Sequence, residues 1–302
     1  MEEATAGDPM TGRKWSRKST RRVSQELNAK GIRVSATTVR SMLKSMKYSL
    51  KCNRKEVAET HHPDRDRQFG IIGETKQRFE SLGQPVISAD TKKKERVGNF
   101  KNPGRTWCKE PERVLVHDFD TQAVGKAIPY GVWEAATKQG TVVVGTSHDT
   151  PEFAVEAIEL WLVASGWNLN PGLKQLFILC DAGGSNGYRV RAWKYWLHVR
   201  ICRSYGIPVT VCHYPPGASK FNPIERRLFS AISQNWAGVP LRSYDVVLDY
   251  IRGTTTTTGL TAEAFLQDKK YETGIKITKA QIKQIPIEYH QPLPNWNYTI
   301  SP

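Results

Sequence analysis

Short hydrophobic runs alternate with amphipathic stretches over the larger part of the chain. The runs at 85–89, 114–116, 141–144, 176–180 and 209–212 are typical of β-strands. Helical spacing of hydrophobic residues predicts helices over 64–82, 152–164, 188–204 and 223–236. Three strands followed by alternating helices and strands predict an α/β fold in which helices flank a mixed sheet. The uninterrupted apolar strands indicate that both faces of that sheet are buried.

A different pattern precedes residue 50. Val23 and Leu27 are spaced for one face of a helix that begins near Ser19, and Gly31 is suited to end it. Ser35 is a good N-cap for a second helix. The apolar face of this second helix is expected to comprise Val39, Met42, Leu43 and Met46. Two short helices around a glycine turn predict a helix-turn-helix, although a purely structural helical hairpin has the same spacing.

Charge favours the DNA-binding interpretation of this hairpin. The chain has a net charge of +15, and residues 10–55 contain 14 Lys and Arg against one acid, Glu26. The mutual repulsion of these cations is relieved when a polyanion binds. The alternative interpretation is a basic tail that is exposed to solvent. The candidate DNA-binding side chains of the second helix point away from its apolar face: Thr37, Thr38, Arg40, Ser41, Lys44 and Lys47. We therefore expect residues 1–60 to form a DNA-binding segment with its linker, and residues 61–302 to form the catalytic domain with a C-terminal extension.

Composition excludes several classes of protein. With 302 residues, of which 39% are hydrophobic, the chain can bury a sizeable core and is not disordered throughout. No run approaches the roughly 18 apolar residues of a membrane span, and the acidic N-terminus does not resemble a secretory signal. Five cysteines without a C-x-x-C pair predict a reduced protein. We expect a cytoplasmic protein that has no membrane partner.

Three acidic residues are candidates for catalysis. Asp90 and Asp181 each follow an apolar strand directly, and Glu225 lies on a helix near the end of the α/β pattern. Reactive groups of α/β proteins gather where strands end, although capping or salt bridging is the default role of any single carboxylate. Asp118, Asp120 and Asp149 also lie near strand ends and are rival candidates.

Carboxylates converging in a basic protein predict a divalent metal site. Mg²⁺ prefers carboxylate oxygens, and Mn²⁺ has similar preferences. Two such ions could activate a water or a 3′-hydroxyl and stabilise the leaving oxygen of a phosphodiester. Lys92 and Lys93, beside Asp90, either bind phosphate or screen the acid; we favour phosphate.

Three segments carry a resemblance to a known family: DTKKKE at 90–95, DAGGSNG at 181–187 and PPGASKFNPIE at 215–225. The sequence resembles the Rhodopirellula-type DDE insertion-sequence transposases from about Gly7 to its end. The resemblance implies a ribonuclease-H-like core with Asp90, Asp181 and Glu225 as the metal-binding triad. It also implies cleavage at transposon ends, strand transfer into target double-stranded DNA, and a homo-oligomer on DNA.

The sequence departs from the family pattern at two places. Ala182 replaces a glycine, which is a mild change. Family members usually begin well upstream of Gly7, so we expect part of the DNA-reading region to be missing. Three hypotheses follow: an active DDE transposase, a truncated and non-mobile DNA-binding remnant, and a ribonuclease-H-like nuclease unconnected with transposition.

Overall fold

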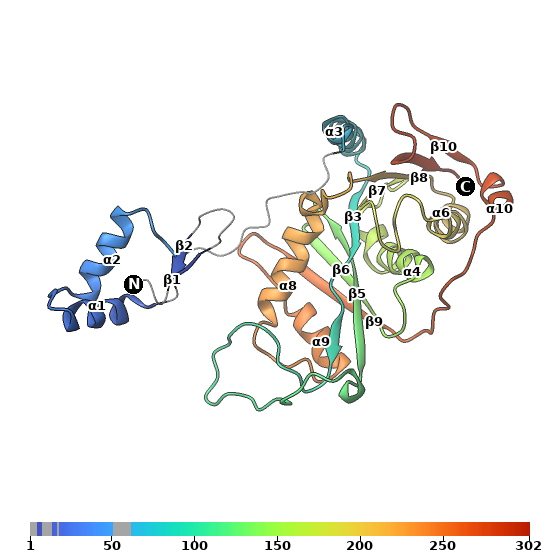
Figure 1. The fold of residues 1–302 in the computed structure, drawn as a ribbon. Coiled ribbons are helices and arrows are strands. Elements are labelled where there is room, and N and C mark those ends of the chain that lie inside the picture. Colours follow the sequence, from blue (N-terminus) through green and yellow to red (C-terminus); the bar gives the residue numbers. More distant parts are fainter. Residues whose placement is uncertain (1–4, 8–13, 17, 51–61) are drawn as a thin grey trace. The chain divides into compact units, whose positions relative to one another are not determined.

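A computed structural model of the protein describes residues 5–7, 14–16, 18–50 and 62–302 (Figure 1). The chain divides into two compact units, Met1–Val57 and Ala58–Pro302. We call them the small unit and the catalytic unit. The boundary between them falls in a stretch, 51–61, whose residues lie outside the described ones.

The small unit contains the predicted helical hairpin. Strand β1 (Thr5–Gly7) pairs antiparallel with β2 (Lys14–Ser16), and helices α1 (Thr20–Ala29) and α2 (Ala36–Ser45) follow. Ser19 Oγ accepts the amide hydrogen of Arg22, and Ser35 Oγ accepts that of Thr38, so both helices have capped N-termini. Gly31, at φ +85°, ends the first helix as predicted.

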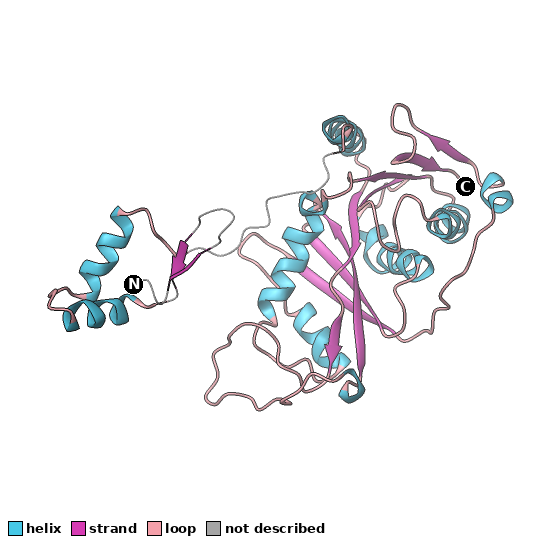
Figure 2. Ribbon diagram, viewed as in Figure 1, coloured by secondary structure: helices cyan, strands magenta, loops and turns pink. Residues whose placement is uncertain are grey.

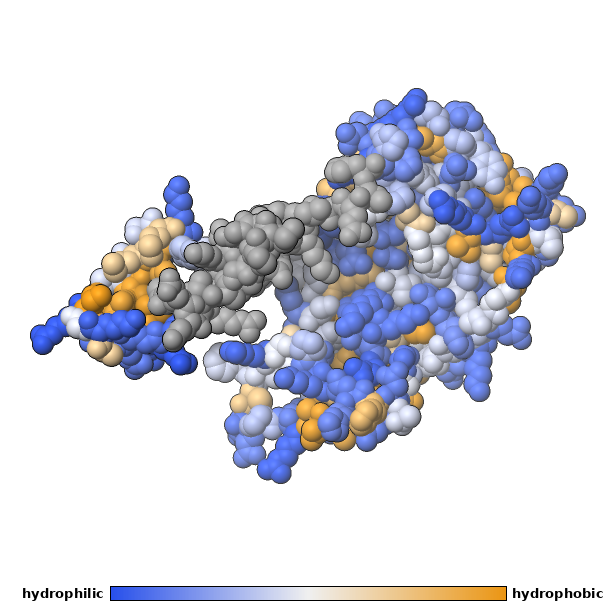
Figure 3. Space-filling model, viewed as in Figure 1, coloured by the Kyte–Doolittle hydropathy of each residue, from blue (hydrophilic) through white to orange (hydrophobic). Residues whose placement is uncertain are grey.

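The apolar face predicted for α2 is partly wrong. Val23 and Val39 are buried between the two helices, whereas Met42 and Met46 are 52% and 57% exposed. Two helices that contact each other along one face cannot cover a stripe as wide as the one that the sequence predicted. The surface of the small unit accordingly shows hydrophobic patches beside its charged residues (Figure 3).

The catalytic unit is built on a nine-stranded mixed sheet. Its strands are β3 (Val86–Thr91), β4 (Glu95–Val97), β5 (Gly125–Glu134), β6 (Gln139–Gly145), β7 (Leu176–Cys180), β8 (Val209–His213), β9 (Thr261–Gln267), β10 (Ile287–Tyr289) and β11 (Asn297–Ile300). They are arranged in the order β10-β11-β8-β7-β3-β5-β6-β9, with β4 paired to β5. The three strands β3, β7 and β8 are parallel, and β5 is antiparallel to both of its neighbours, β3 and β6.

This topology confirms the predicted fold class. The strands β3, β5, β6, β7 and β8, first to fifth in the chain, lie side by side in the order fifth, fourth, first, second, third. Among these five strands, only the pairs that β5 forms with β3 and with β6 are antiparallel. This completes the ribonuclease-H-like pattern that the resemblance implied. In the described part of the chain no helix has both the length and the apolar character needed to cross a membrane.

The predicted strand at 114–116 is wrong. These residues form a loop, and Val116 is 91% exposed. The second strand is instead β5, whose sequence includes Pro129 and Gly131. Gly131 is required there because a Cβ atom would lie 2.5 Å from the Phe229 ring and 2.9 Å from Ile224. The glycine thus lets a helix pack directly on the strand.

Helices cover both faces of the sheet (Figures 1 and 2). They are α3 (Arg65–Ser81), α4 (Pro151–Trp161), α5 (Trp167–Leu169), α6 (Arg191–Trp196), α7 (Arg203–Tyr205), α8 (Ser230–Asn235), α9 (Tyr244–Arg252) and α10 (Lys279–Lys283). Wider π-helical turns extend three of them, at Leu162–Gly166, Leu197–Cys202 and Glu225–Phe229, and short 3₁₀ turns lie at Asp120–Gln122 and Ser219–Phe221. The helix predicted over 64–82 is α3, with Phe79 fully buried, but Leu82 is 57% exposed because it caps the helix end.

Alternation along the strands divides the core into layers. Ile87 and Ala89 of β3 pack with α4 and α6 on one face, whereas Val86 packs with α3 on the other. On β6, Val143 joins the first layer, and its neighbours Val142 and Val144 join the layer of α8 and α9. The predicted burial of both faces is confirmed. Strands β3 and β7 lie between the layer of α4 and α6 and the layer of α3.

Candidate active site

The sheet brings two of the predicted carboxylates to one edge. Asp181 follows β7 directly, as predicted, whereas Asp90 lies within β3, opposite Gly131 of β5. The parallel register pairs Ser88 with Leu179, so continuing it by two residues sets Asp90 beside Asp181. The expectation that Asp90 follows its strand is therefore wrong, since β3 extends two residues beyond the predicted end, to Thr91.

Glu225 comes from the helix that packs on β5. It is the first residue of the π-helical turn Glu225–Phe229, and the neighbouring Ile224 and Phe229 cover Gly131. Because Gly131 pairs with Asp90, this close approach brings the start of the helix to the strand that carries Asp90. Asp90, Asp181 and Glu225, far apart in sequence, thus belong to one region of the catalytic unit.

The three carboxylates act on one another electrostatically. Burial raises the pKa of Asp90 to about 8, and the charges of Asp181, Glu225 and Asp149 add to that rise. Burial also raises the pKa of Asp181, against the hydrogen bond from Asn222. The pKa of Glu225 is raised by burial first and by Asp181 second, while Lys92 opposes the shift. An excess of negative charge is therefore concentrated at this edge.

The donor chemistry of this edge fits a hard divalent cation. Carboxylate oxygens that repel one another in a partly desolvated site are stabilised by such an ion. Within the described residues, however, no three carboxylate, imidazole or thiolate groups already have the arrangement that holds a metal ion. Asp90, Asp181 and Glu225 would have to draw closer together around an ion.

Asn222 connects the segments that carry the three acids. Ser88 Oγ donates a hydrogen bond to Asn222 Oδ1, and Asn222 Nδ2 donates to Asp181 Oδ1 at 2.9 Å. The Asn222 carbonyl accepts the amide hydrogen of Glu225 at 3.3 Å. The Asn222 side chain is fully buried, so these partners fix its orientation. It therefore aligns β3, the end of β7 and the helix of Glu225.

A second amide attaches the glycine-rich segment after Asp181 to β3. Asn186 Nδ2 donates to the carbonyl of Ala89 at 3.0 Å and contacts the Tyr130 hydroxyl at 3.3 Å. Within this turn Gly184 has φ +81°, whereas a Cβ on Gly183 would meet nothing within 4 Å. The space above Gly183 leaves the turn open to a ligand.

A buried histidine supports the backbone of Asp181. His213 Nδ1 lies 2.9 Å from the Asp181 carbonyl, and Nε2 lies 3.0 Å from the Tyr298 hydroxyl. Trp193 Nε1 donates to that hydroxyl at 3.1 Å, so the hydroxyl hydrogen is available to His213 Nε2. Nδ1 then carries the hydrogen that Asp181 accepts. Burial lowers the pKa of His213 to about 4, which keeps the ring neutral.

The lysines next to Asp90 are placed differently from one another. Lys92 is buried; its Nζ lies 3.1 Å from Glu95 Oε1 and 4.5 Å from the centre of the Trp236 ring. Lys93 and Lys94 are exposed, and Lys94 Nζ lies 4.0 Å from Asp149 Oδ2. Only Lys93 and Lys94 of this run are thus open to a phosphate, whereas Lys92 offsets the charge of Glu225.

The rival acids separate into two groups. Asp118 and Asp120 form exposed ion pairs with Arg96, and Asp120 also pairs with Lys126. Asp149 instead accepts a hydrogen bond from Thr91 Oγ1 at 3.2 Å and contributes to the raised pKa of Asp90. Asp149 therefore lies beside the candidate site, and the other two do not interact with it.

Sequence reasoning missed Asn186, Asn222 and His213 as parts of the site. Asn186 and Asn222 lie within the motifs 181–187 and 215–225, which could have drawn attention to them, whereas the only signal for His213 was its place at a strand end. The DNA-binding candidates of the small unit are all exposed on or just beyond α2: Thr37, Thr38, Arg40, Ser41, Lys44 and Lys47.

Comparisons with known proteins identify relatives of this chain. The family described as "Rhodopirellula transposase DDE domain" matches residues 1–302. A search of curated proteins found no match. The Mos1 transposase paired-end complex with left transposon end is similar at 14% identity, covering 78% of this chain and 65% of that chain, with a TM-score of 0.46.

Two further solved structures are similar. The Mos1 strand transfer complex matches at 14% identity, covering 78% of this chain and 64% of that chain, with a TM-score of 0.43. The catalytic core domain of HTLV-2 integrase with magnesium matches at 11% identity, covering 58% of this chain and 90% of that chain, with a TM-score of 0.29. The chain spans slightly less than two thirds of the Mos1 chains.

Proposed function

Because the chain belongs to the Rhodopirellula transposase DDE domain family, we propose that it is a DNA transposase of an insertion sequence. It would cleave DNA at transposon ends and join those ends to target DNA. Asp90, Asp181 and Glu225 would be its catalytic carboxylates. The observation that carries this proposal is the strand register that sets Asp90 beside Asp181, together with Asn222, which donates to Asp181 and accepts the amide hydrogen of Glu225.

The three carboxylates would hold Mg²⁺ or Mn²⁺. Bound ions of this kind supply the positive charge that activates an attacking water or 3′-hydroxyl and stabilises the leaving oxygen. We propose two ions, since three carboxylates and one phosphodiester together carry four negative charges. Asn222 would keep Asp181 oriented toward the ions through its 2.9 Å hydrogen bond. His213 would serve in holding the Asp181 backbone, because a neutral, fully buried ring cannot exchange protons with substrate.

DNA would be recognised by both units. In the DNA-binding segment expected over residues 1–60, the exposed side chains of α2 would enter a groove of double-stranded DNA, with Arg40 and Lys44 neutralising phosphates. In the catalytic domain, residues 61–302, Lys93 would contact phosphate next to the carboxylates.

Synapsis of two ends would require more than one chain. The described residues contain one coupled set of carboxylates, whereas a transposon has two ends to be joined. We therefore propose a homo-oligomer on DNA, acting in the cytoplasm.

The proposed activity can be tested by strand transfer. The full chain is incubated with supercoiled plasmid and a labelled, precut DNA duplex that carries the terminal repeat flanking its gene. With Mg²⁺ or Mn²⁺ we expect covalent joining of label to plasmid, lost on chelation and in Glu225→Gln. Nicking without joining would indicate the ribonuclease-H-like nuclease instead. Binding without either reaction would indicate a non-mobile DNA-binding remnant.

A further inference from the structure

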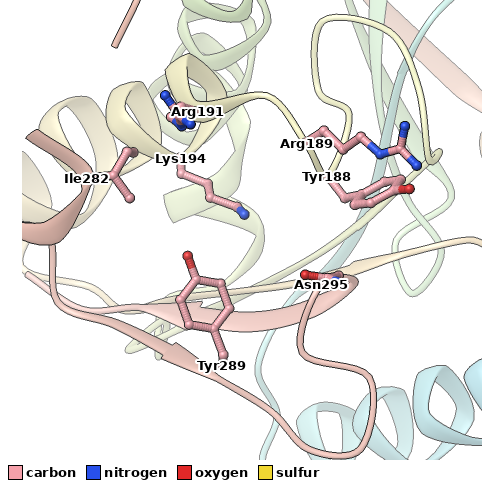
Figure 4. A pocket seen from close by; sticks show the side chains of 7 residues that line it. All are labelled: Tyr188, Arg189, Arg191, Lys194, Ile282, Tyr289 and Asn295. Atoms are coloured by element: carbon pink, nitrogen blue, oxygen red, sulfur yellow. The ribbon is translucent and has the colours of Figure 1, made fainter. Parts of the chain in front are cut away.

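A basic pocket lies on the catalytic unit apart from the carboxylates. Its volume is about 380 Å³, and Figure 4 shows the side chains around it. The lining residues are Tyr188, Arg189, Arg191, Lys194, Ile282, Tyr289 and Asn295. Three of these seven residues are cations and none is an acid. A cavity of this size is within the range of ligand sites, about 300–1,000 Å³.

Lys194 is the most enclosed cation of this pocket. Its Nζ lies 4.6 Å from the centre of the Tyr298 ring and 5.3 Å from that of Tyr289. In Figure 4 the Lys194 side chain descends from its helix, and the Tyr289 hydroxyl rises toward it from the opposite wall. No carboxylate of the described residues forms an ion pair with Lys194. Burial consequently lowers the pKa of this ammonium, which an anion would stabilise.

The second wall combines a cation with an aromatic ring. The Arg189 guanidinium lies 5.0 Å from the centre of the Tyr188 ring. Tyr188 in turn packs edge-on against His213 and Trp296, at ring separations of 6.2 and 6.3 Å. The ring is thus fixed from behind, while Arg189 is exposed. Cations beside an immobilised aromatic face are the combination that binds a nucleic acid strand.

The pocket is connected to the candidate active site. Tyr188 and Arg189 are at the end of the segment that begins with Asp181. Tyr298, under Lys194, contacts His213, which contacts the Asp181 carbonyl. The pocket and the Asp181 backbone are therefore linked both along the chain and through the buried side chains of Tyr298 and His213.

We propose that the pocket binds a backbone phosphate of the DNA strand that extends from the catalytic carboxylates, with Lys194 and Arg189 on the phosphate and Tyr188 against its sugar or base. This proposal deepens the proposed function, since it specifies where the same enzyme would hold its DNA. A DNA strand is favoured over an acidic peptide because the cations stand beside aromatic rings, which stack on bases.

The test measures binding of the full chain to a random-sequence 30-base-pair duplex with a five-nucleotide 3′ tail, at several salt concentrations. Arg189→Gln/Arg191→Gln/Lys194→Gln should weaken binding about tenfold. It should also reduce the slope of log K against log salt by about 0.9, because the pocket is proposed to hold one phosphate. The matched control, Lys174→Gln/Arg203→Gln/Lys270→Gln, removes three exposed charges elsewhere and should keep the wild-type slope.

Single variants show whether the triple variant loses binding through misfolding or through the loss of its cations. Arg189→Gln changes an exposed side chain, and Lys194→Met keeps a long chain against Tyr298; each should lower the slope by about 1 without changing the thermal midpoint. A slope equal to that of wild type in all pocket variants would overturn the proposal. So would binding of dTMP or inorganic phosphate to the pocket, measured by calorimetry, with DNA binding unaffected in the variants.

The pocket and the proposed function can fail separately. All binding is measured in Glu225→Gln with EDTA, where no reaction occurs. A reduced slope there supports the pocket even if strand transfer by the wild type is never observed. Normal strand transfer by a pocket variant with the wild-type slope would retain the transposase and reject the pocket.

Discussion

The two units of this protein place their charges in opposite ways. In the small unit the cations of α2, such as Arg40 and Lys44, are exposed, and Val23 and Val39 supply the buried apolar contact between the helices. In the catalytic unit the charged groups of the candidate active site are partly buried acids. Burial raises the pKa of one of them, Asp90, to about 8. Exposed charges attract DNA over a distance and respond to salt, whereas enclosed charges depend on their hydrogen-bond partners.

Because of this difference, substitutions in the two units should impair different steps of the proposed reaction. Loss of a cation from the small unit should weaken binding and leave the chemical step intact. Loss of an acid or of its supporting amide should slow the reaction and leave binding intact. The following experiments separate these outcomes.

The largest effect is expected from Asp181→Asn. Removing one carboxylate from a site that binds divalent metal should cost several kcal/mol of transition-state stabilisation, or at least about 10³-fold in strand-transfer rate. DNA affinity in EDTA should stay within about twofold of wild type. Single-turnover joining and fluorescence anisotropy measure the two quantities. A fully active Asp181→Asn protein would remove Asp181 from the site.

A smaller effect is expected from Asn222→Ala. The substitution deletes the amide that joins Ser88 to Asp181, so Asp181 loses its orientation but keeps its charge. Loss of such outer partners typically costs about 10–100-fold in metal affinity or activity. Raising the Mn²⁺ concentration should therefore restore part of the rate, which it should not do for Asp181→Asn. Identical metal titrations for wild type and Asn222→Ala would contradict this role.

The metal-free protein should lose stability as the pH rises. The pKa of Asp90 is about 8 in the folded protein and near 4 when unfolded, so its contribution to stability is fully present below pH 4 and disappears as the pH passes 8. Urea unfolding in EDTA should show a drop on the order of 4 kcal/mol between pH 5 and pH 9. Asp90→Asn should reduce this drop. Asp120→Asn, at an exposed acid, should not.

The smallest effect is expected in the small unit. Arg40→Gln/Lys44→Gln should lower DNA affinity about tenfold and reduce the salt slope by about 2, because two phosphate contacts are lost. Unfolding free energy should change by less than about 0.5 kcal/mol, since both side chains are exposed. The control Arg21→Gln/Lys30→Gln changes exposed cations of α1. An equal loss in that control would mean that α2 is not the reading helix.

The fold could be predicted where local chemistry and packing agree. The helix-capping serines Ser19 and Ser35 and the glycine stops follow from the sequence because they act within a few residues of themselves. The strands β7 and β8 follow because their residues are uniformly apolar. Strand β5 escaped prediction because Gly131 and Pro129 suit a turn by themselves, and only contact with a helix explains the glycine. Strand β9 also escaped, because its buried Ala262 and Ala264 give little hydrophobic signal.

The acids of the candidate site could be predicted from the sequence, but the residues that hydrogen-bond to them could not. Asp181 stands out because it ends an apolar strand, and Glu225 because it follows a long motif. Asn222 lies within the same motif, 215–225, but its partner Ser88 lies 134 positions away. Hydrogen bonds between segments so far apart depend on the completed sheet, which a local pattern does not describe.

The pairing of Gln68 with Asn297 has a consequence for synthesis. Gln68 Nε2 donates to Asn297 Oδ1 and to the His213 carbonyl, both at 2.8 Å, across 229 positions in the first case. While a ribosome still holds the last strand, the fully buried amide of Gln68 lacks its partner and β8 remains an open edge. The edge of β8 is therefore expected to stay open to other strands in the nascent polypeptide until the segment that carries Asn297 has emerged from the ribosome.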